Sequence, residues 1–290
     1  MMKRILKAFG ILLLFAVSVT MISALICRFC LKITCYEQSL PGIREEHTVV
    51  CLSDLHGLEY GRGNAWLLED TASQDPDAIF VLGDMMNLDA DDADLKEFLL
   101  LMENLRKIAP VCFTYGNHEM DYLLAGGADL DELLKARDIT VFRDSFVETK
   151  LGSDSVRIGG SLGHYYGYDW TEEEKWNPPD YAMEESIGTS DLPAIVLLHM
   201  PETILLDSAV ARWTGDLYLS GHTHGGGIRI PGIGGLFAPT QGFFPKYDKG
   251  QFCVFDDRFP LIITAGLSGY DGVPRIFNRP EICVIRLIPE

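Results

Sequence analysis

Short runs of apolar, often β-branched residues recur along the chain, and each is followed by polar residues or by glycine. Runs without alternating polar positions are typical of strands that are covered on both faces. Between several of these runs, apolar residues recur at helical spacing. The pattern predicts strands at 48–52, 78–82, 111–115, 140–148, 156–160, 194–198 and 217–219, helices at 64–73, 95–109 and 130–137, and two or three further strands within 251–288. This alternation indicates an α/β fold.

The longest apolar run lies near the N-terminus. Residues 8–27 carry no charge, three basic side chains precede them, and two more follow by position 32. Twenty such residues can span a bilayer as a helix. A cleaved signal peptide is the alternative, but its apolar part is usually about 7 to 15 residues long and a small-residue cleavage site is expected after it. We therefore expect a single-pass anchor at 1–34 and a domain at 45–290, which the basic residues before the span place outside the cytoplasm.

Charge and composition narrow the functional classes. The formal net charge of -18 argues against a partner that is a nucleic acid or an anionic membrane surface, because both require a basic protein surface. An acidic chain also suits the binding of divalent cations. Four of the seven cysteines fall in predicted strands, where a free thiol behaves as a small buried apolar group, so we expect no disulfide framework; they are Cys51, Cys112, Cys253 and Cys283.

Side chains that can bind metal ions follow five of the predicted strands. Because open α/β sheets bind ligands beyond the carboxyl ends of their strands, these side chains are expected to lie close together. Any one of them alone would be read as an ordinary polar turn. Nitrogen and oxygen ligands without a thiolate suit Mn, Fe or Zn in a catalytic site. The residues are Asp54, His56, Asp84, Asn117, His118, His199, His222 and His224.

Five short motifs occur in a fixed order at these strand ends. They are Asp54-x-His56, Gly83-Asp84, Gly116-Asn117-His118-Glu119, the single His199 and Gly221-His222-x-His224. In this order they resemble the signature of the calcineurin-like metallophosphoesterases. The stretch 222–237 and the tail 274–281 resemble more narrowly the bacterial branch with an N-terminal membrane segment. The resemblance covers residues 49–287 and implies two packed mixed β-sheets flanked by helices.

The resemblance also implies a role for each site residue. One divalent ion is expected on Asp54, His56, Asp84 and His224, and a second on Asp84, Asn117, His199 and His222, with Asp84 shared between the ions. Two ions about 3.5 to 4 Å apart can clamp a phosphoryl group and generate a hydroxide nucleophile. His118 matches the position that contacts the phosphate and protonates the leaving group. Asn87 stands where the family often has an aspartate that orients this histidine, so the charge state of His118 is an open question.

The expected activity is metal-dependent hydrolysis of a phosphodiester by a hydroxide activated by two metal ions. The membrane segment favours a substrate related to lipids or to the cell envelope. A phosphomonoesterase of the same fold is the alternative, and a metal-binding scaffold without turnover is less favoured because all seven ligands are present. Residues 163–191, rich in aromatic and acidic side chains, form either a wall of the site or a surface insertion.

Overall fold

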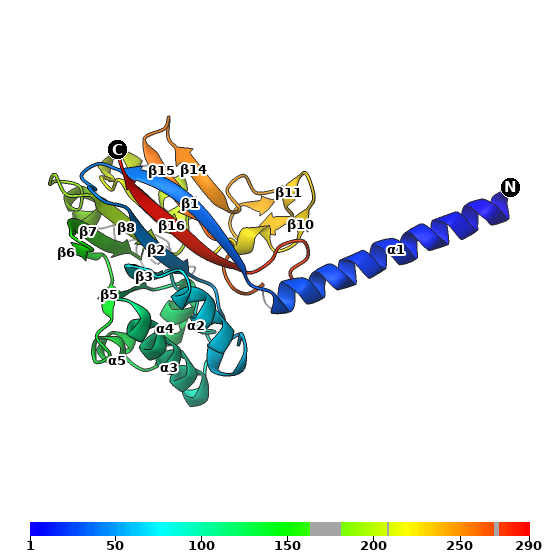
Figure 1. Cartoon of the computed structure of the whole chain (residues 1–290), viewed down its shortest axis with the longest axis horizontal. Helices are drawn as coiled ribbons and strands as arrows, with labels where there is room; N and C mark the ends of the chain where they lie inside the picture. The colour runs from blue at the N-terminus through cyan, green and yellow to red at the C-terminus, as the bar shows by residue number, and fades with distance from the viewer. Residues whose placement is uncertain (163–180, 208, 270–272) are drawn as a thin grey trace, which may run out of the picture.

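Two six-stranded sheets pack against each other in the computed structural model, and one long helix extends away from them (Figure 1). The structure describes residues 1–162, 181–207, 209–269 and 273–290. Most of the expected insertion, 163–180, therefore lies outside the described residues. The predicted α/β fold with two packed mixed sheets is confirmed.

The first sheet has the strand order β1-β16-β2-β3-β4-β5, and β2 to β5 run parallel. The bounds are β1 (Lys32–Leu40), β16 (Glu281–Pro289), β2 (His47–Leu52), β3 (Ala78–Val81), β4 (Val111–Thr114) and β5 (Thr140–Phe142). The second sheet has the order β14-β15-β9-β8-β7-β6, in which β7, β8, β9 and β15 are parallel. Its bounds are β14 (Gly250–Val254), β15 (Phe259–Ile263), β9 (Leu217–Ser220), β8 (Ala194–Leu198), β7 (Asp154–Ser161) and β6 (Ser145–Leu151).

Helices cover the outer face of the first sheet (Figure 1). They are η1 (Arg62–Asn64), α2 (Ala65–Ala72), α3 (Asp92–Ile108), α4 (Asn117–Leu124) and α5 (Leu130–Lys135). The Asp91 side chain accepts from the backbone N–H of Asp94, and the Asp94 side chain accepts from that of Asp91, so a capping box starts α3. Shorter elements lie within the second half of the chain. They are α6 (Ala182–Ser186), α7 (Glu202–Leu205), η3 (Val210–Arg212), η4 (His224–Gly226), β10 (Arg229–Ile230), β11 (Gly234–Gly235), β12 (Phe237–Ala238) and β13 (Gly242–Phe243).

Alternate residues of each central strand enter different cores. In β2, Val49 and Cys51 pack between the two sheets with Ile195 and Leu219 of the second sheet. Val50 faces the other way, into the core beneath the helices. Since both faces of the strand are covered, its sequence is apolar throughout, which explains the continuous runs in the sequence.

Three features differ from the sequence predictions. The run 140–148 is two strands, because the backbone turns at Asp144 with φ 45° and the chain passes from the first sheet into the second. Strand β1 was not predicted, although its nine residues pair in parallel with β16. Cys253 is exposed on β14 and is not the buried group that was expected.

Helix α1 (Met2–Phe29) contains the predicted apolar run and extends it at both ends. It is long and apolar enough to cross a membrane, and a signal sequence has the same properties. Only Ser23 and Cys27 of this helix are buried. The Ser23 hydroxyl oxygen accepts a hydrogen bond of 2.7 Å from the backbone N–H of Phe277, and Arg279 donates to the carbonyl oxygens of Cys30 and Leu31. The C-terminal end of α1 is thus bound to the segment that precedes β16.

Candidate metal centre

The expected site residues lie where the carboxyl ends of the two sheets meet. Asp54 and His56 follow β2, Asp84 follows β3, and Asn117 and His118 begin α4 after β4. From the second sheet, His199 follows β8, and His222 and His224 follow β9. The sheets are joined at this edge because the His199 ring donates from Nδ1 to the Leu82 carbonyl oxygen at 2.7 Å.

Five of these side chains sit on residues with left-handed backbone dihedral angles. The φ values lie between 48° and 66° for His224, His56, Asp84, Asp54 and His222. Side chains other than glycine adopt this region at a cost, and such residues are concentrated at functional sites. Each strand therefore ends in a sharp turn that directs its side chain back over the sheet edge.

The acidic and imidazole groups form three overlapping clusters, in each of which the candidate ligand atoms lie within 4.8 Å of one another. The clusters are Asp54 with His56 and His224, Asp84 with His199 and His222, and His56 with Asp84 and His118. One oxygen atom connects them. Oδ2 of Asp84 lies 3.0 Å from Nε2 of His199 and 3.7 Å from Nε2 of His56.

Three of the histidines are fixed in one tautomer by their second ring nitrogen. Nδ1 of His56 donates to Oδ1 of Asn87 at 3.2 Å, and Nδ1 of His224 donates to the Ser268 carbonyl oxygen at 2.9 Å. His199 makes the equivalent bond to Leu82. An oxygen acceptor on Nδ1 leaves Nε2 of a neutral ring as a lone-pair donor, which is the usual arrangement of metal-binding histidines.

Several buried polar atoms of the site have no hydrogen-bond partner among the described residues. They are Oδ1 of Asn117, Nε2 of His56 and both ring nitrogens of His222. Buried polar atoms are nearly always satisfied, so a group of them at one place indicates a missing ligand. A set of imidazole nitrogens, carboxylates and one amide oxygen fits Mn, Fe or Zn.

The electrostatics of the site also favour cations. Burial lowers the pKa of His56 and of His224 to about 4, so both rings are neutral at pH 7. Burial also raises the pKa of Asp54. Burial acts to lower the pKa of His199, but the carboxylates of Asp84 and Asp54 outweigh it and raise that pKa to about 10. The two carboxylates therefore favour positive charge at the position that faces Nε2 of His199.

His118 belongs to the third cluster, and its ring makes an edge contact with His56, at 4.4 Å between ring centroids. Nδ1 of the His118 ring accepts a hydrogen bond of 3.3 Å from the backbone N–H of Leu88. The backbone N–H of His118 donates to Oδ1 of Asp84 at 2.8 Å. Asn87, by contrast, contacts His56 through both side-chain amide atoms. The orienting contact on His118 expected from the family pattern is thus made by the Leu88 backbone.

Glu119 is a supporting residue whose role was not predicted from the sequence. Its carboxylate is fully buried and accepts hydrogen bonds from the backbone N–H groups of Asp84, Met85, Met86 and Gly116 at 2.7 to 3.1 Å. These bonds fix the turn that carries Asp84. Its position three residues after Gly116, at the third position of α4, is the sequence signal that could have identified it.

Arg275 and Asn278 support the turn of His224 from the far end of the chain. Arg275 is buried and donates to five backbone carbonyl oxygens, including those of His224 and Ser268. Asn278 donates from Nδ2 to the carbonyl oxygens of His224 and Gly227 at 2.8 Å. The tail motif that resembles the bacterial branch therefore has a structural role in the site.

The family model for calcineurin-like phosphoesterases matches residues 47–226. An uncharacterized metallophosphoesterase of Helicobacter pylori (strain J99) is 27% identical over 87% of this chain and 62% of its own length, so this chain spans less than two thirds of that relative. Phosphodiesterase YaeI of Escherichia coli (strain K12) is 28% identical over 74% of this chain and 72% of its own. UDP-2,3-diacylglucosamine pyrophosphatase LpxG of Chlamydia muridarum is 34% identical over 48% of this chain and 39% of its own. The chain belongs to the calcineurin-like phosphoesterase family.

Proposed function

We propose that the protein is a metal-dependent phosphodiesterase that holds two divalent ions at the carboxyl ends of its two sheets. Asp54, His56 and His224 would hold one ion, and Asn117, His199 and His222 the other, with Asp84 shared. The observation that carries this proposal is the position of Oδ2 of Asp84, within 3.7 Å of Nε2 atoms that belong to different clusters. When bound, a pair of such ions polarises a phosphoryl group and lowers the pKa of water.

The chain itself supplies the acid for the leaving group. Because the Leu88 N–H donates to Nδ1 of His118, the proton of the neutral ring is on Nε2. The hydrogen bond from the backbone N–H of His118 to the Asp84 carboxylate fixes the start of α4 relative to the clusters. For this step the ring would first take up a second proton on Nδ1, in place of the Leu88 hydrogen bond. His118 would then donate its Nε2 proton to the departing oxygen and return to a neutral ring, while the surrounding ligands hold the phosphoryl group.

A diester is favoured over a monoester by the space beside the site. A pocket of about 650 Å³ extends from His56 and His118 and is lined by residues of several elements. A phosphoryl group alone would leave most of this volume empty, whereas a second substituent on phosphorus would occupy it. Two relatives, named phosphodiesterase YaeI and UDP-2,3-diacylglucosamine pyrophosphatase LpxG, support the same choice.

The test compares bis(p-nitrophenyl) phosphate with p-nitrophenyl phosphate, using full-length protein in detergent. The protein is treated with EDTA and then supplied with Mn²⁺, Zn²⁺ or Fe²⁺. We expect p-nitrophenol release from the diester that depends on added metal and exceeds release from the monoester. Faster monoester hydrolysis would replace the proposal by the phosphomonoesterase alternative, and no metal-dependent hydrolysis of either ester would refute it.

We also propose that α1 is a retained membrane anchor, that the domain begins at β1, and that this domain lies outside the cytoplasm. The support is the continuous apolar helix with its basic N-terminal end, followed at once by the first strand. The intact mass of protein extracted from membranes tests retention. Protease added to cells with a permeable wall and an intact inner membrane should digest the domain; protection until lysis would reverse the orientation.

A further inference from the structure

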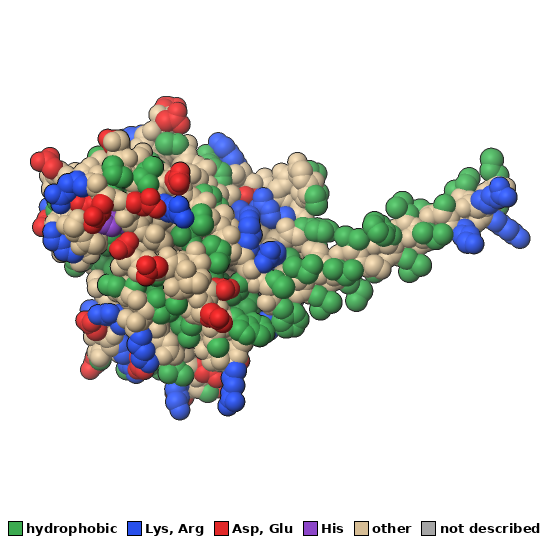
Figure 2. All heavy atoms as spheres, in the orientation of Figure 1, with side chains coloured by type: hydrophobic (Ala, Val, Ile, Leu, Met, Phe, Trp, Pro, Cys, Tyr) green, Lys and Arg blue, Asp and Glu red, His purple; other side chains and the backbone are tan. Residues whose placement is uncertain are grey.

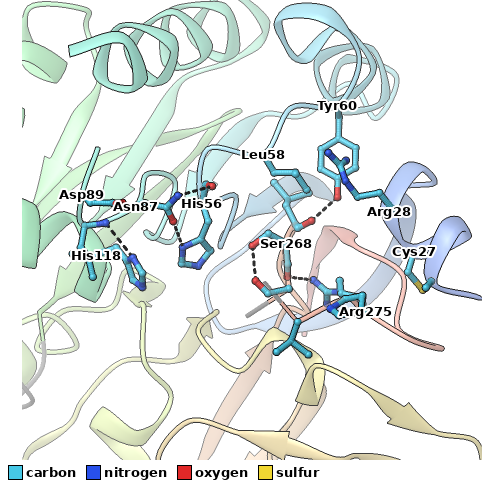
Figure 3. A pocket seen from close by; sticks show the side chains of 16 residues that line it. Cys27, Arg28, His56, Leu58, Tyr60, Asn87, Asp89, His118, Ser268 and Arg275 are labelled. Carbon is cyan, nitrogen blue, oxygen red and sulfur yellow. Dashed lines mark hydrogen bonds between the residues drawn. The ribbon is translucent and has the colours of Figure 1, made fainter. Parts of the chain in front are cut away.

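The pocket beside the metal centre has one wall made by the long N-terminal helix. At one end it is lined by His56, Asn87 and His118, and at the other by Ala24, Cys27 and Arg28 of α1. Figure 3 shows His56, Asn87 and His118 on one side of the pocket and Cys27 and Arg28 on the other, with Leu58 and Ser268 between them. The helix end is held there by the hydrogen bonds of Ser23 and Arg279. The site and the candidate anchor therefore share one cavity.

The two ends of this pocket differ in chemistry. The end at His118 is lined by the imidazoles of His56 and His118, the Asn87 amide and the Asp89 carboxylate, and it adjoins the clusters whose metal ions would bind a phosphoryl group. Arg28 extends from the helix toward Tyr60 at the other end (Figure 3) and is solvent-exposed, so its charge is open to a ligand. Arg275 also lines the pocket, but its guanidinium is occupied by backbone carbonyls. Arg28 is thus the cation at this end that a substrate can reach.

Apolar side chains surround the mouth of the pocket. Val273, which lines it, is 45% exposed, and Phe277, which is bonded to α1, is 43% exposed. Trp66, which lies beside Phe29 at the helix base, is 53% exposed. Figure 2 shows that apolar side chains cover α1 and continue onto the adjoining surface of the domain. A hydrocarbon chain that leaves the pocket along α1 would therefore meet apolar side chains of the helix and of the domain, with Glu69 and Asp70 also present beside Trp66.

We propose that α1 forms part of the substrate-binding site and that the substrate is an amphipathic phosphodiester with a long hydrocarbon chain. The phosphodiester lies at the metal centre, Arg28 binds a polar oxygen of the lipid's head region, and the hydrocarbon chain passes beside Ala24 into the bilayer. Arg28 acts as a positioning residue. This inference rests on the proposed phosphodiesterase activity and on retention of the helix.

The test uses two diesters that have the same leaving group. Methyl p-nitrophenyl phosphate and hexadecyl p-nitrophenyl phosphate are both singly charged and differ only in the alkyl chain. Full-length protein in mixed micelles should hydrolyse the hexadecyl ester with a kcat/KM at least tenfold higher than that of the methyl ester. Equal kcat/KM values would overturn the inference, because they would show that the alkyl chain of the substrate gains no binding energy from the pocket.

Ala24→Trp fills the pocket from the helix side, and Leu25→Trp is the matched control, since Leu25 is 58% exposed on the same helix and does not line the pocket. We expect Ala24→Trp to lower kcat/KM for the hexadecyl ester at least tenfold, with methyl ester hydrolysis within twofold of wild type, which also shows that the variant is folded. Leu25→Trp should change neither. The hexadecyl ester has no head-region oxygen for Arg28. Arg28→Gln should therefore raise KM, with kcat unchanged, only for a p-nitrophenyl diester whose long alkyl chain also carries hydroxyl or ester oxygens near phosphorus.

Binding separates this inference from the proposed activity. Dodecylphosphonate should raise the thermal midpoint of the wild-type protein more than methylphosphonate does, and Ala24→Trp should abolish the difference. If neither diester is hydrolysed but this difference is found, the proposed phosphodiesterase activity fails and the lipid-binding pocket stands. If both diesters are hydrolysed but the Ala24→Trp variant has the same kcat/KM as the wild type for each of them, the proposed activity stands and α1 has no part in the site.

Discussion

Replacing Glu119 by Gln tests whether its carboxylate holds the metal centre together. Each carboxylate oxygen accepts two backbone N–H groups: Oε2 those of Asp84 and Gly116, and Oε1 those of Met85 and Met86. A glutamine in either orientation turns its NH₂ group toward two of these donors. Two hydrogen bonds to a charged acceptor are then lost, and such bonds contribute about 1.5 to 3 kcal/mol each. We use the lower value, about 1.5 kcal/mol, because the substitution also removes the repulsion between the Glu119 and Asp84 carboxylates. The expected cost is about 3 kcal/mol, or about 6 to 12 °C in Tm.

The assay combines the thermal midpoint of purified protein in detergent with metal content and diester turnover. Asp121→Asn is the matched control, because Asp121 lies exposed on the same helix and loses the same charge. We expect the Glu119 variant to lose metal and at least tenfold in turnover, since the turn of Asp84 is no longer fixed. A thermal midpoint within 1 °C of the control, with unchanged turnover, would refute the role of these four hydrogen bonds.

Four further predictions follow from the structure. Asp84→Asn should abolish turnover and lower metal content without changing the circular dichroism spectrum; full activity with intact metal would contradict a shared ligand. His118→Gln should slow an alkyl diester at least about tenfold more than a p-nitrophenyl diester, because only the alkoxide needs a general acid, and equal losses would leave His118 a positioning role. The backbone N–H groups of Arg44 and Glu45, the Arg44 side chain and His47 hold the pKa of Asp154 below its usual range. The stability that this carboxylate provides should be lost as pH falls below about 5, so urea unfolding should show a larger loss for the wild type than for Asp154→Asn over that range. A chain that starts at Lys32 lacks the α1 wall of the pocket but should be soluble and should hydrolyse methyl p-nitrophenyl phosphate. A chain that starts at residue 41 also lacks β1, leaves β16 as an open edge and should aggregate in light scattering.

The site was predictable from the sequence to the extent that it depends on local order. A buried strand ends, a turn follows, and the first polar side chains of the turn lie at the sheet edge, as with Asp54 after β2 and His199 after β8. Contacts between distant segments left no such signal. The hydrogen bond between Asn87 and His56 depends on how two turns approach each other. From the sequence alone, there was no reason to expect Asn87 to contact His56 and not His118.

Strand β1 was missed for a different reason. Its residues alternate between exposed and more buried positions, as expected for an edge strand, but the apolar run before it and Pro41 after it suggested an anchor and a linker. The strand forms because all nine of its residues pair in parallel with β16, which lies more than two hundred residues away in the sequence. No window of sequence around β1 contains that partner.

The place of β16 between β1 and β2 has a consequence for biosynthesis. The N-terminal helix and both neighbouring strands leave the ribosome long before β16, and at about 5 to 20 residues per second the interval is tens of seconds. During this time the strand edges of β1 and β2 that later pair with β16 remain open. We expect nascent chains halted before residue 281 to be sensitive to protease and bound by chaperones, and chains released after β16 to become resistant in a single step.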